Sequence, residues 1–286
     1  HNHLGTLAFV TPVAESREWR ASATLCRNWD GARERAASFG FGITEFALGS
    51  RGMTGRRLGE ILHARGISGV LLAAFPAEPY EITLPWDEFV WVQVGHCSIK
   101  SPRLDCVVSD HTEAVTMAAR KIAALGHRRV GLAIEQYQDH ITDGRWSLGF
   151  AGLRASVPEL LDVPPLLPPT MTAEVFLPWV ERHAVECVLT LSTFHNQPNP
   201  MASWLSAQRK RALREVGLVS LDVTSHPAWS GVEQHPEEIG RAAVDLLFSK
   251  LQVGARGVPQ LPYTLQVHGH WHDGRTLAAA LPERRA

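Results

Sequence analysis

Residues 66–74 read Gly-Ile-Ser-Gly-Val-Leu-Leu-Ala-Ala, and this stretch decides the class of fold. Gly66 ends a predicted helix over residues 54–64, in which Leu58, Ile61 and Leu62 fall three and four positions apart. The apolar run that starts at Gly69 is typical of a strand buried on both faces of a parallel sheet. Parallel strands need helical crossovers, so helices and strands should alternate on both sides of this stretch.

The alternation is present, and it occurs twice. The first half has predicted strands at 6–10, 42–48, 69–74 and 89–94, with helices at 19–39 and 54–64. After Asp110 we predict helices at 113–125, 145–155, 173–183, 201–215 and 237–251, and strands at 129–134, 187–191, 218–222 and 263–267. Five prolines between 157 and 172 predict an extended connector there. The fold class is therefore α/β, with two doubly wound parallel sheets, and ligands of such sheets lie outside the carboxyl ends of the strands.

Composition excludes several classes of protein. The chain of 286 residues carries 28 Lys+Arg against 29 Asp+Glu, so no basic stripe for nucleic acid is evident. Its apolar runs are too short to span a bilayer, so we expect no membrane partner. The four cysteines are scattered, which predicts reduced, buried thiols in a cytoplasmic protein. The chain lacks an initiator Met, which predicts a trimmed or processed product.

Six short motifs follow one another along the chain. They are Gly66-Ile-Ser-Gly-Val-Leu-Leu72, Asp105-Cys-Val-Val-Ser-Asp110, Leu125-Gly-His-Arg-Arg-Val-Gly131, Val219-Ser-Leu-Asp222, Val232-Glu-Gln-His-Pro236 and Ile239-Gly-Arg-Ala-Ala243. In this combination, from Leu4 to about Thr276, the chain resembles the effector-binding core of LacI/GalR-type transcription regulators. That core is built like a type I periplasmic binding protein, with strands that cross between two lobes.

The resemblance implies a domain division and a function. It places residues 1–110 and 236–261 in an N-terminal lobe and residues 111–235 and 262–286 in a C-terminal lobe. A small effector, most often a sugar, would bind in the cleft between the lobes and change operator affinity. The DNA-binding domain would precede Thr6 and be absent from this chain, and the parent protein, a repressor, would be a cytoplasmic homodimer. The alternative is an extracytoplasmic solute-binding protein that feeds a transporter.

Two aspartates, Asp110 and Asp222, each end a strand, at positions where a ligand would lie. Asp222 suits paired sugar hydroxyls, because a carboxylate accepts two strong hydrogen bonds, and the resemblance favours this role. Asp110 can either cap the following helix or face the ligand. The resemblance places Gln234 near the crossover between lobes, where its amide could bridge ligand and hinge.

Two departures from the family pattern affect the predicted effector site. The family has Arg-x-x-Gly before an aromatic residue, whereas this chain has Trp146 at the spacing of the arginine and Arg145 one position earlier. Either Arg145 reaches the ligand or Trp146 replaces it with an aromatic face, unless Trp146 packs between helix and sheet. The family's Asn-Asp is also replaced, by Thr193 and Phe194. More aromatic surface would favour stacking against a sugar ring.

Other constellations are weaker. His268, His270 and His272 alternate along a predicted extended segment, but four converging zinc ligands with the usual spacing are not found, so we expect no metal site and no cofactor. The sequence has no nucleophile elbow, no phosphate-binding glycine loop and no His-Glu-x-x-His. We therefore expect a binding protein without catalytic residues.

Overall fold

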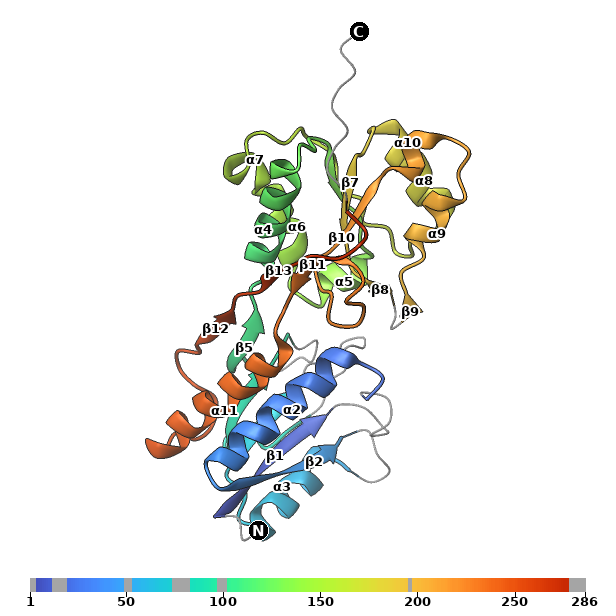
Figure 1. The fold of residues 1–286 in the computed structure, drawn as a ribbon. Helices are drawn as coiled ribbons and strands as arrows, with labels where there is room; N and C mark the ends of the chain where they lie inside the picture. The colour runs from blue at the N-terminus through green and yellow to red at the C-terminus, as the bar shows by residue number, and fades with distance from the viewer. Residues whose placement is uncertain are drawn as a thin grey trace. The chain divides into compact units, whose positions relative to one another are not determined.

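The structure is a computed structural model that describes residues 4–11, 20–48, 53–73, 83–96, 102–194 and 197–277. The chain divides into two compact units (Figure 1). Unit 1 holds residues 1–109 and 235–267, and unit 2 holds residues 110–234 and 268–286. Each unit is an α/β layer structure built on its own sheet, so the predicted fold class is confirmed.

Unit 1 is built on a six-stranded sheet in which all neighbours are parallel. The strand order is β12-β5-β4-β3-β1-β2. The strands are β1 (Gly5–Thr11), β2 (Phe41–Ala47), β3 (Gly69–Ala73), β4 (Val90–Val94), β5 (Asp105–Ser109) and β12 (Thr264–Val267). The helices are α2 (Ala23–Ser38), α3 (Gly55–Ala64) and α11 (Pro236–Gln252). All of β3 is buried, as its uninterrupted apolar run predicts.

The helices of unit 1 begin at residues suited to the task. Ser22 and Thr54 precede α2 and α3, and their hydroxyl oxygens accept hydrogen bonds from the backbone N–H groups of Leu25 and Arg57. Helix α11 begins with Pro236, whose missing N–H costs nothing in the first turn. Local sequence therefore sets where these helices start.

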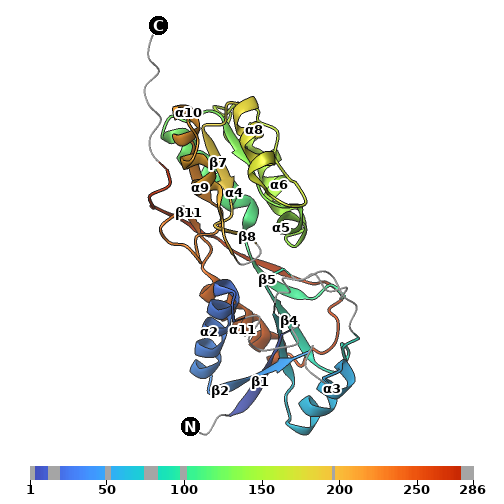
Figure 2. The same cartoon turned by 90° about the vertical axis from the view of Figure 1, so that its right-hand side faces the viewer.

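Helices α2 and α11 pack side by side along one face of the unit 1 sheet (Figures 1 and 2). Two glycines allow their backbones to touch. A Cβ at Gly31 would lie 2.0 Å from the carbonyl oxygen of Glu237, and a Cβ at Gly240 would lie 2.0 Å from that of Asn28. No other residue fits at either position without moving a helix.

Unit 2 is built on a five-stranded sheet in the order β13-β11-β10-β7-β6. The strands are β6 (Val130–Leu132), β7 (Cys187–Thr190), β10 (Gly217–Ser220), β11 (Ser230–Glu233) and β13 (His270–His272). Only β13 is antiparallel to its neighbour. Strands β8 (Thr193–Phe194) and β9 (Gln197–Pro198) form a separate antiparallel pair. The helices are α4 (His111–Ala124), α5 (Gln136–His140), α6 (Arg145–Ala151), α7 (Leu153–Ser156), α8 (Ala173–Arg182), α9 (Met201–Ser206) and α10 (Arg211–Arg214).

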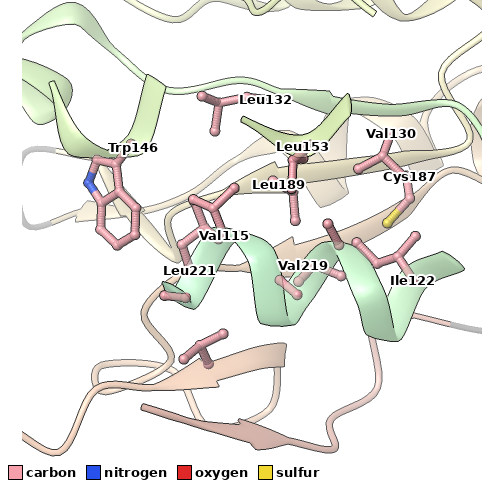
Figure 3. Packing of buried hydrophobic residues seen from close by; sticks show 14 of the residues in the cluster. Val115, Ile122, Val130, Leu132, Trp146, Leu153, Cys187, Leu189, Val219 and Leu221 are labelled. Carbon is pink, nitrogen blue, oxygen red and sulfur yellow. The ribbon is translucent and has the colours of Figure 1, made fainter. Parts of the chain in front are cut away.

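Alternating side chains give the unit 2 sheet two apolar faces. Leu189 and Val219 lie on the face covered by α4, where they pack with Val115 (Figure 3). Their neighbours Val188 and Leu218 lie on the opposite face, in a cluster with residues of α8 and α9. Strands β7 and β10 are thus buried on both sides.

Two predictions about elements are wrong. Residues 262–267 belong to unit 1, because β12 pairs in parallel with β5 at the edge of its sheet. Residues 201–215 form two short helices, α9 and α10, rather than one. The break at 207–210 leaves Arg209 and Lys210 exposed, while Leu205 and Leu213 on either side reach the same core.

The cysteines were expected to be buried thiols, and this holds for one of the three that the structure describes. Cys26, Cys106 and Cys187 are free thiols, but only Cys187 is buried, and this burial raises the pKa of its thiol. Cys97, the predicted helix start at Trp19 and residue 74 of the predicted strand lie outside the described residues. No helix of the described segments has the length and apolar character that a membrane span requires.

Candidate functional site

The candidate site lies at the carboxyl edge of the unit 2 sheet. Strands β6, β7, β10 and β11 run parallel, so the residues that follow them share one edge. Polar residues stand at each of these strand ends: Glu135, Ser192, Asp222 and Gln234. The segments that follow β1 and β3 of unit 1, and the segment after β4 from residue 97 on, lie outside the described residues.

Gln234, which follows β11, is held by one half of its amide only. Its side chain is 3% exposed, and its Nε2 donates a hydrogen bond to the carbonyl oxygen of Leu221 at 2.5 Å. Its Oε1 is buried and has no hydrogen-bond partner among the described residues. A buried acceptor without a donor is costly, so this oxygen is suited to a donor supplied by a ligand.

Asp222, which follows β10, is fixed by its own turn. Its carboxylate Oδ1 accepts a hydrogen bond from the backbone N–H of Thr224 at 2.9 Å, and its carbonyl oxygen accepts one from Ser192 Oγ at 2.8 Å. The residue is half-buried. Thr224 Oγ1 is buried without a partner in the described part of the chain. Gln234 donates its hydrogen bond to Leu221, the residue directly before Asp222. The structure therefore brings these two predicted residues together.

Arg145 opens α6, directly after Gly144, whose φ of 70° is a left-handed conformation that favours glycine. The ring of Trp146 lies 4.3 Å from the ring of His111, which places the start of α6 beside the start of α4. Helix α4 leads into β6, so its start lies at the carboxyl edge of the sheet. Arg145 Nε is buried and lacks a hydrogen-bond partner within the described ranges. Arg145 therefore brings a donor to this edge.

Trp146 itself is a core residue. It is 3% exposed and belongs to the apolar cluster of α4 and the sheet, with Val115 and Leu221 (Figure 3). The packing alternative for Trp146 is thus the one observed, and its indole is not available as a stacking face. Trp146 packs between α6 and the sheet, whereas Arg145 lies about 100° away around the helix axis, so its side chain leaves α6 in a different direction.

Asp110 caps α4. Its Oδ1 accepts a hydrogen bond from the backbone N–H of Glu113 at 3.0 Å, and its Oδ2 lies 3.6 Å from Nδ1 of His268. The capping alternative is observed for Oδ1, and effector contact by Asp110 stays a prediction. His268 thus lies beside a carboxylate, and His272 Nε2 lies 2.7 Å from the carbonyl oxygen of Pro227.

Thr193 and Phe194 form the short strand β8. Phe194 is 7% exposed and packs with Phe176 and Met201, so it does not supply the expected aromatic surface. The carbonyl oxygen of Thr193 accepts a hydrogen bond from Gln138 Nε2 at 2.9 Å. Thr193 therefore contributes to the support of the edge through its backbone.

Sequence reasoning missed the residues that support this edge. Gln138 Oε1 accepts a hydrogen bond from the backbone N–H of Glu135 at 3.0 Å, and Glu135 Oε1 accepts one from Met171 N–H at 2.8 Å. The signal was the Glu-x-x-Gln spacing after a buried strand, which is a capping box. Asn199 Nδ2 likewise donates to the carbonyl oxygen of Leu191 at 2.6 Å. Among the described residues no three His, Cys, Asp or Glu side chains converge as metal ligands.

The chain was compared with protein families, with curated proteins and with solved structures. No family model matches the chain, and no curated protein matches it. Solved structures match over nearly the whole chain. The transcriptional regulator CelR in complex with cellobiose has a TM-score of 0.67 and 18% identity, over 96% of this chain and 85% of that one.

Two further regulators have the same fold. The LacI family regulator CCPA of Weissella paramesenteroides, with bound glucose, has a TM-score of 0.62 and 12% identity, over 96% of this chain and 98% of that one. CcpA of Lactococcus lactis has a TM-score of 0.61 and 13% identity, over 95% of this chain and 99% of that one. At these identities the similarity is one of fold. The chain has the fold of LacI-type transcription regulators.

Proposed function

We propose that this chain is the effector-sensing domain of a DNA-binding transcription regulator, a repressor, and that it binds a sugar or a related polyhydroxylated molecule at the carboxyl edge of the unit 2 sheet. The observation that carries the proposal is a set of buried polar atoms without partners at this edge: Arg145 Nε, Thr224 Oγ1 and Gln234 Oε1. Their unmet hydrogen bonds would be made by the effector.

The chemistry of this set suits hydroxyl groups. Gln234 Oε1 and the Asp222 carboxylate accept hydrogen bonds, Arg145 Nε donates one, and Thr224 Oγ1 does either. A hydroxyl group both donates and accepts, so a ring with several hydroxyls has the donors and the acceptors that these four groups require. A purely anionic effector would use only Arg145 and would be repelled by Asp222.

The regulator is favoured over an extracytoplasmic solute-binding protein by the neighbours in fold, which are described as transcription regulators, two of them with cellobiose or glucose bound. The regulator would act in the cytoplasm and contact operator DNA through a domain preceding this chain. The parent gene tests this directly. A helix-turn-helix segment encoded upstream supports the proposal, and a cleavable export signal there overturns it.

The effector site is tested by a thermal-shift screen of the chain against mono- and disaccharides, with purines and amino acids as comparison sets. A ligand that binds only the native state raises the melting temperature by mass action. With the best sugar, Asp222→Ala should weaken binding about tenfold or more, because it removes a charged acceptor. The matched control is Asp162→Ala, which changes an exposed aspartate that pairs with exposed Arg154. Equal binding by wild type and Asp222→Ala would contradict the site.

The proposed regulator would be a homodimer, because two DNA-binding heads must match two operator half-sites. Sedimentation of the chain at micromolar concentration measures its mass. A mass of twice 31.5 kDa supports a dimer formed by this core, and a mass of 31.5 kDa contradicts it.

A further inference from the structure

Unit 2 has a pocket of about 710 Å³ at the amino edge of its sheet, the edge opposite the candidate effector site. The pocket opens where β7 and β10 begin, and its wall includes Gly217, the first residue of β10. The other walls come from the end of α8, from α10 and from residues 275–276. Its volume is in the range of small-molecule sites.

The acidic side chains around this pocket are already engaged. Glu181 is paired with Lys210, and Glu215 with Arg211, whose Nε lies 2.6 Å from Glu215 Oε1. The carboxylate of Glu186 accepts hydrogen bonds from the backbone N–H groups of residues 128 and 129, at 2.6 and 3.1 Å. The negative charges of the lining therefore face protein donors.

Two arginines of the lining are not engaged in this way. Within the described residues, the guanidinium groups of Arg214 and Arg275 have no ion-pair or hydrogen-bond partner. They differ from Arg128, whose Nη1 donates to the carbonyl oxygen of Ala123 at the end of α4 and so acts as a helix cap. Two uncommitted guanidinium groups that line one pocket are suited to an anionic group, since their planar forks match carboxylate and phosphate oxygens.

The floor of the pocket is apolar. Val180, Val185 and Leu213 line it and are 1%, 4% and 6% exposed. They belong to the core on the α8 face of the sheet. Such a floor would receive the apolar body of a ligand, while the rim arginines would hold its acidic group.

We propose that this pocket is a second ligand site of the chain, and that it binds a small organic molecule in which an apolar body carries a phosphate or carboxylate group. Arg214 and Arg275 contact the acidic group. The site is independent of the proposed effector edge, because it lies at the opposite ends of the same strands.

The test uses calorimetric titration of the chain with phenyl phosphate, phenylacetate and phenol. We expect one or both acids to bind with a Kd of about 1 mM or below, and uncharged phenol to bind at least about tenfold more weakly. The acid that binds more tightly identifies the head group. The double variant Arg214→Gln/Arg275→Gln should weaken binding of that acid about tenfold or more.

The matched control is Arg209→Gln, an exposed arginine near α10 that does not line the pocket, and it should bind as wild type does. All variants change exposed side chains, and an unchanged melting temperature confirms that they fold. The proposal is overturned if the double variant binds the acid as tightly as wild type, if phenol binds equally well, or if neither acid binds.

Discussion

The two units share one architecture but use their polar groups differently. In unit 1, ion pairs connect α2 and α11: Arg27 with Glu237, Arg35 with Asp245 at 2.6 Å, and Arg241 with Glu34 at 2.7 Å. In unit 2, the polar groups at the carboxyl edge are mostly uncharged amides and hydroxyls, and several are buried, among them Gln138, Asn199 and Gln234.

The difference teaches where to look for a site. Each partly exposed ion pair contributes little to stability, because water screens the charges. Those of unit 1 therefore add little to the contact between α2 and α11, the helix seam, which Gly31 and Gly240 already determine. Buried polar groups without charge need a hydrogen-bond partner, so a buried polar atom that lacks one points to a ligand site. In unit 2 the edge is held together by hydrogen bonds except at the few atoms that we assign to an effector.

The largest effect on stability is expected from a substitution that breaks the helix seam of unit 1. Gly240→Val would place a Cβ 2.0 Å from the carbonyl oxygen of Asn28 and 2.8 Å from the backbone nitrogen of Ala32. Because backbone atoms cannot yield cheaply, we expect a loss of about 3 kcal/mol or more in the free energy of unfolding, measured by urea denaturation. The control is Gly152→Ala in unit 2, where the nearest atom is 3.5 Å away. Similar midpoints for both variants would refute the close approach.

The next effect concerns the support of the unit 2 edge. Glu135→Ala removes a 2% exposed side chain whose Oε1 accepts a hydrogen bond from Met171 N–H. The amide of Met171 is left buried without its acceptor, so we expect a loss of about 2 kcal/mol. Thermal unfolding measures it. A change below about 0.5 kcal/mol, the usual range of surface substitutions, would show that Glu135 does not support this edge.

A smaller stability effect separates folding from binding at Gln234. Gln234→Leu removes one hydrogen bond to Leu221 and an acceptor without a partner, so we expect a loss of about 1 kcal/mol or less. The affinity for the best sugar should fall about tenfold or more, because a hydroxyl group of the sugar loses Oε1 as its hydrogen-bond acceptor. Titration of wild type and variant compares the two affinities. Retained affinity would remove Gln234 from the effector site.

The smallest effect is the pH dependence of the unit 1 seam. Partial burial raises the pKa of Glu237, but the hydrogen bond and charge of Arg27 outweigh it, so the pKa lies below the usual value of a glutamate. A lowered folded-state pKa means that the stabilisation is present above the unfolded pKa and is lost as the pH falls through the folded pKa. Glu237→Gln should therefore cost about 0.5 kcal/mol at pH 7 and progressively less below about pH 4.5. A stability difference that stays constant from pH 7 to about pH 3 would contradict this assignment.

The candidate site was predictable in part. Asp222 ends a strand that periodicity locates. Gln234 was placed near the crossover by the resemblance alone, because the strand before it, β11, was not predicted from the pattern. The capping box of Glu135 and Gln138 had a signal in the sequence, but the contacts of these residues with Met171 and Thr193 were not predictable, because they join separate segments of the chain. Trp146 and Asp110 had two open roles each, and spacing alone could not choose between them.

The sequence by itself determined the alternation of helices and strands, the buried character of β3 and the starts of the capped helices. These depend on side-chain periodicity and on contacts within a few residues. The tertiary structure decided that residues 262–267 extend the unit 1 sheet, that Trp146 is buried while Arg145 beside it carries an unpaired nitrogen, and that Gln234 bonds through one amide atom only. Each of these depends on which distant backbone lies alongside, because burial and hydrogen-bond partners are set by packing between elements and not within them.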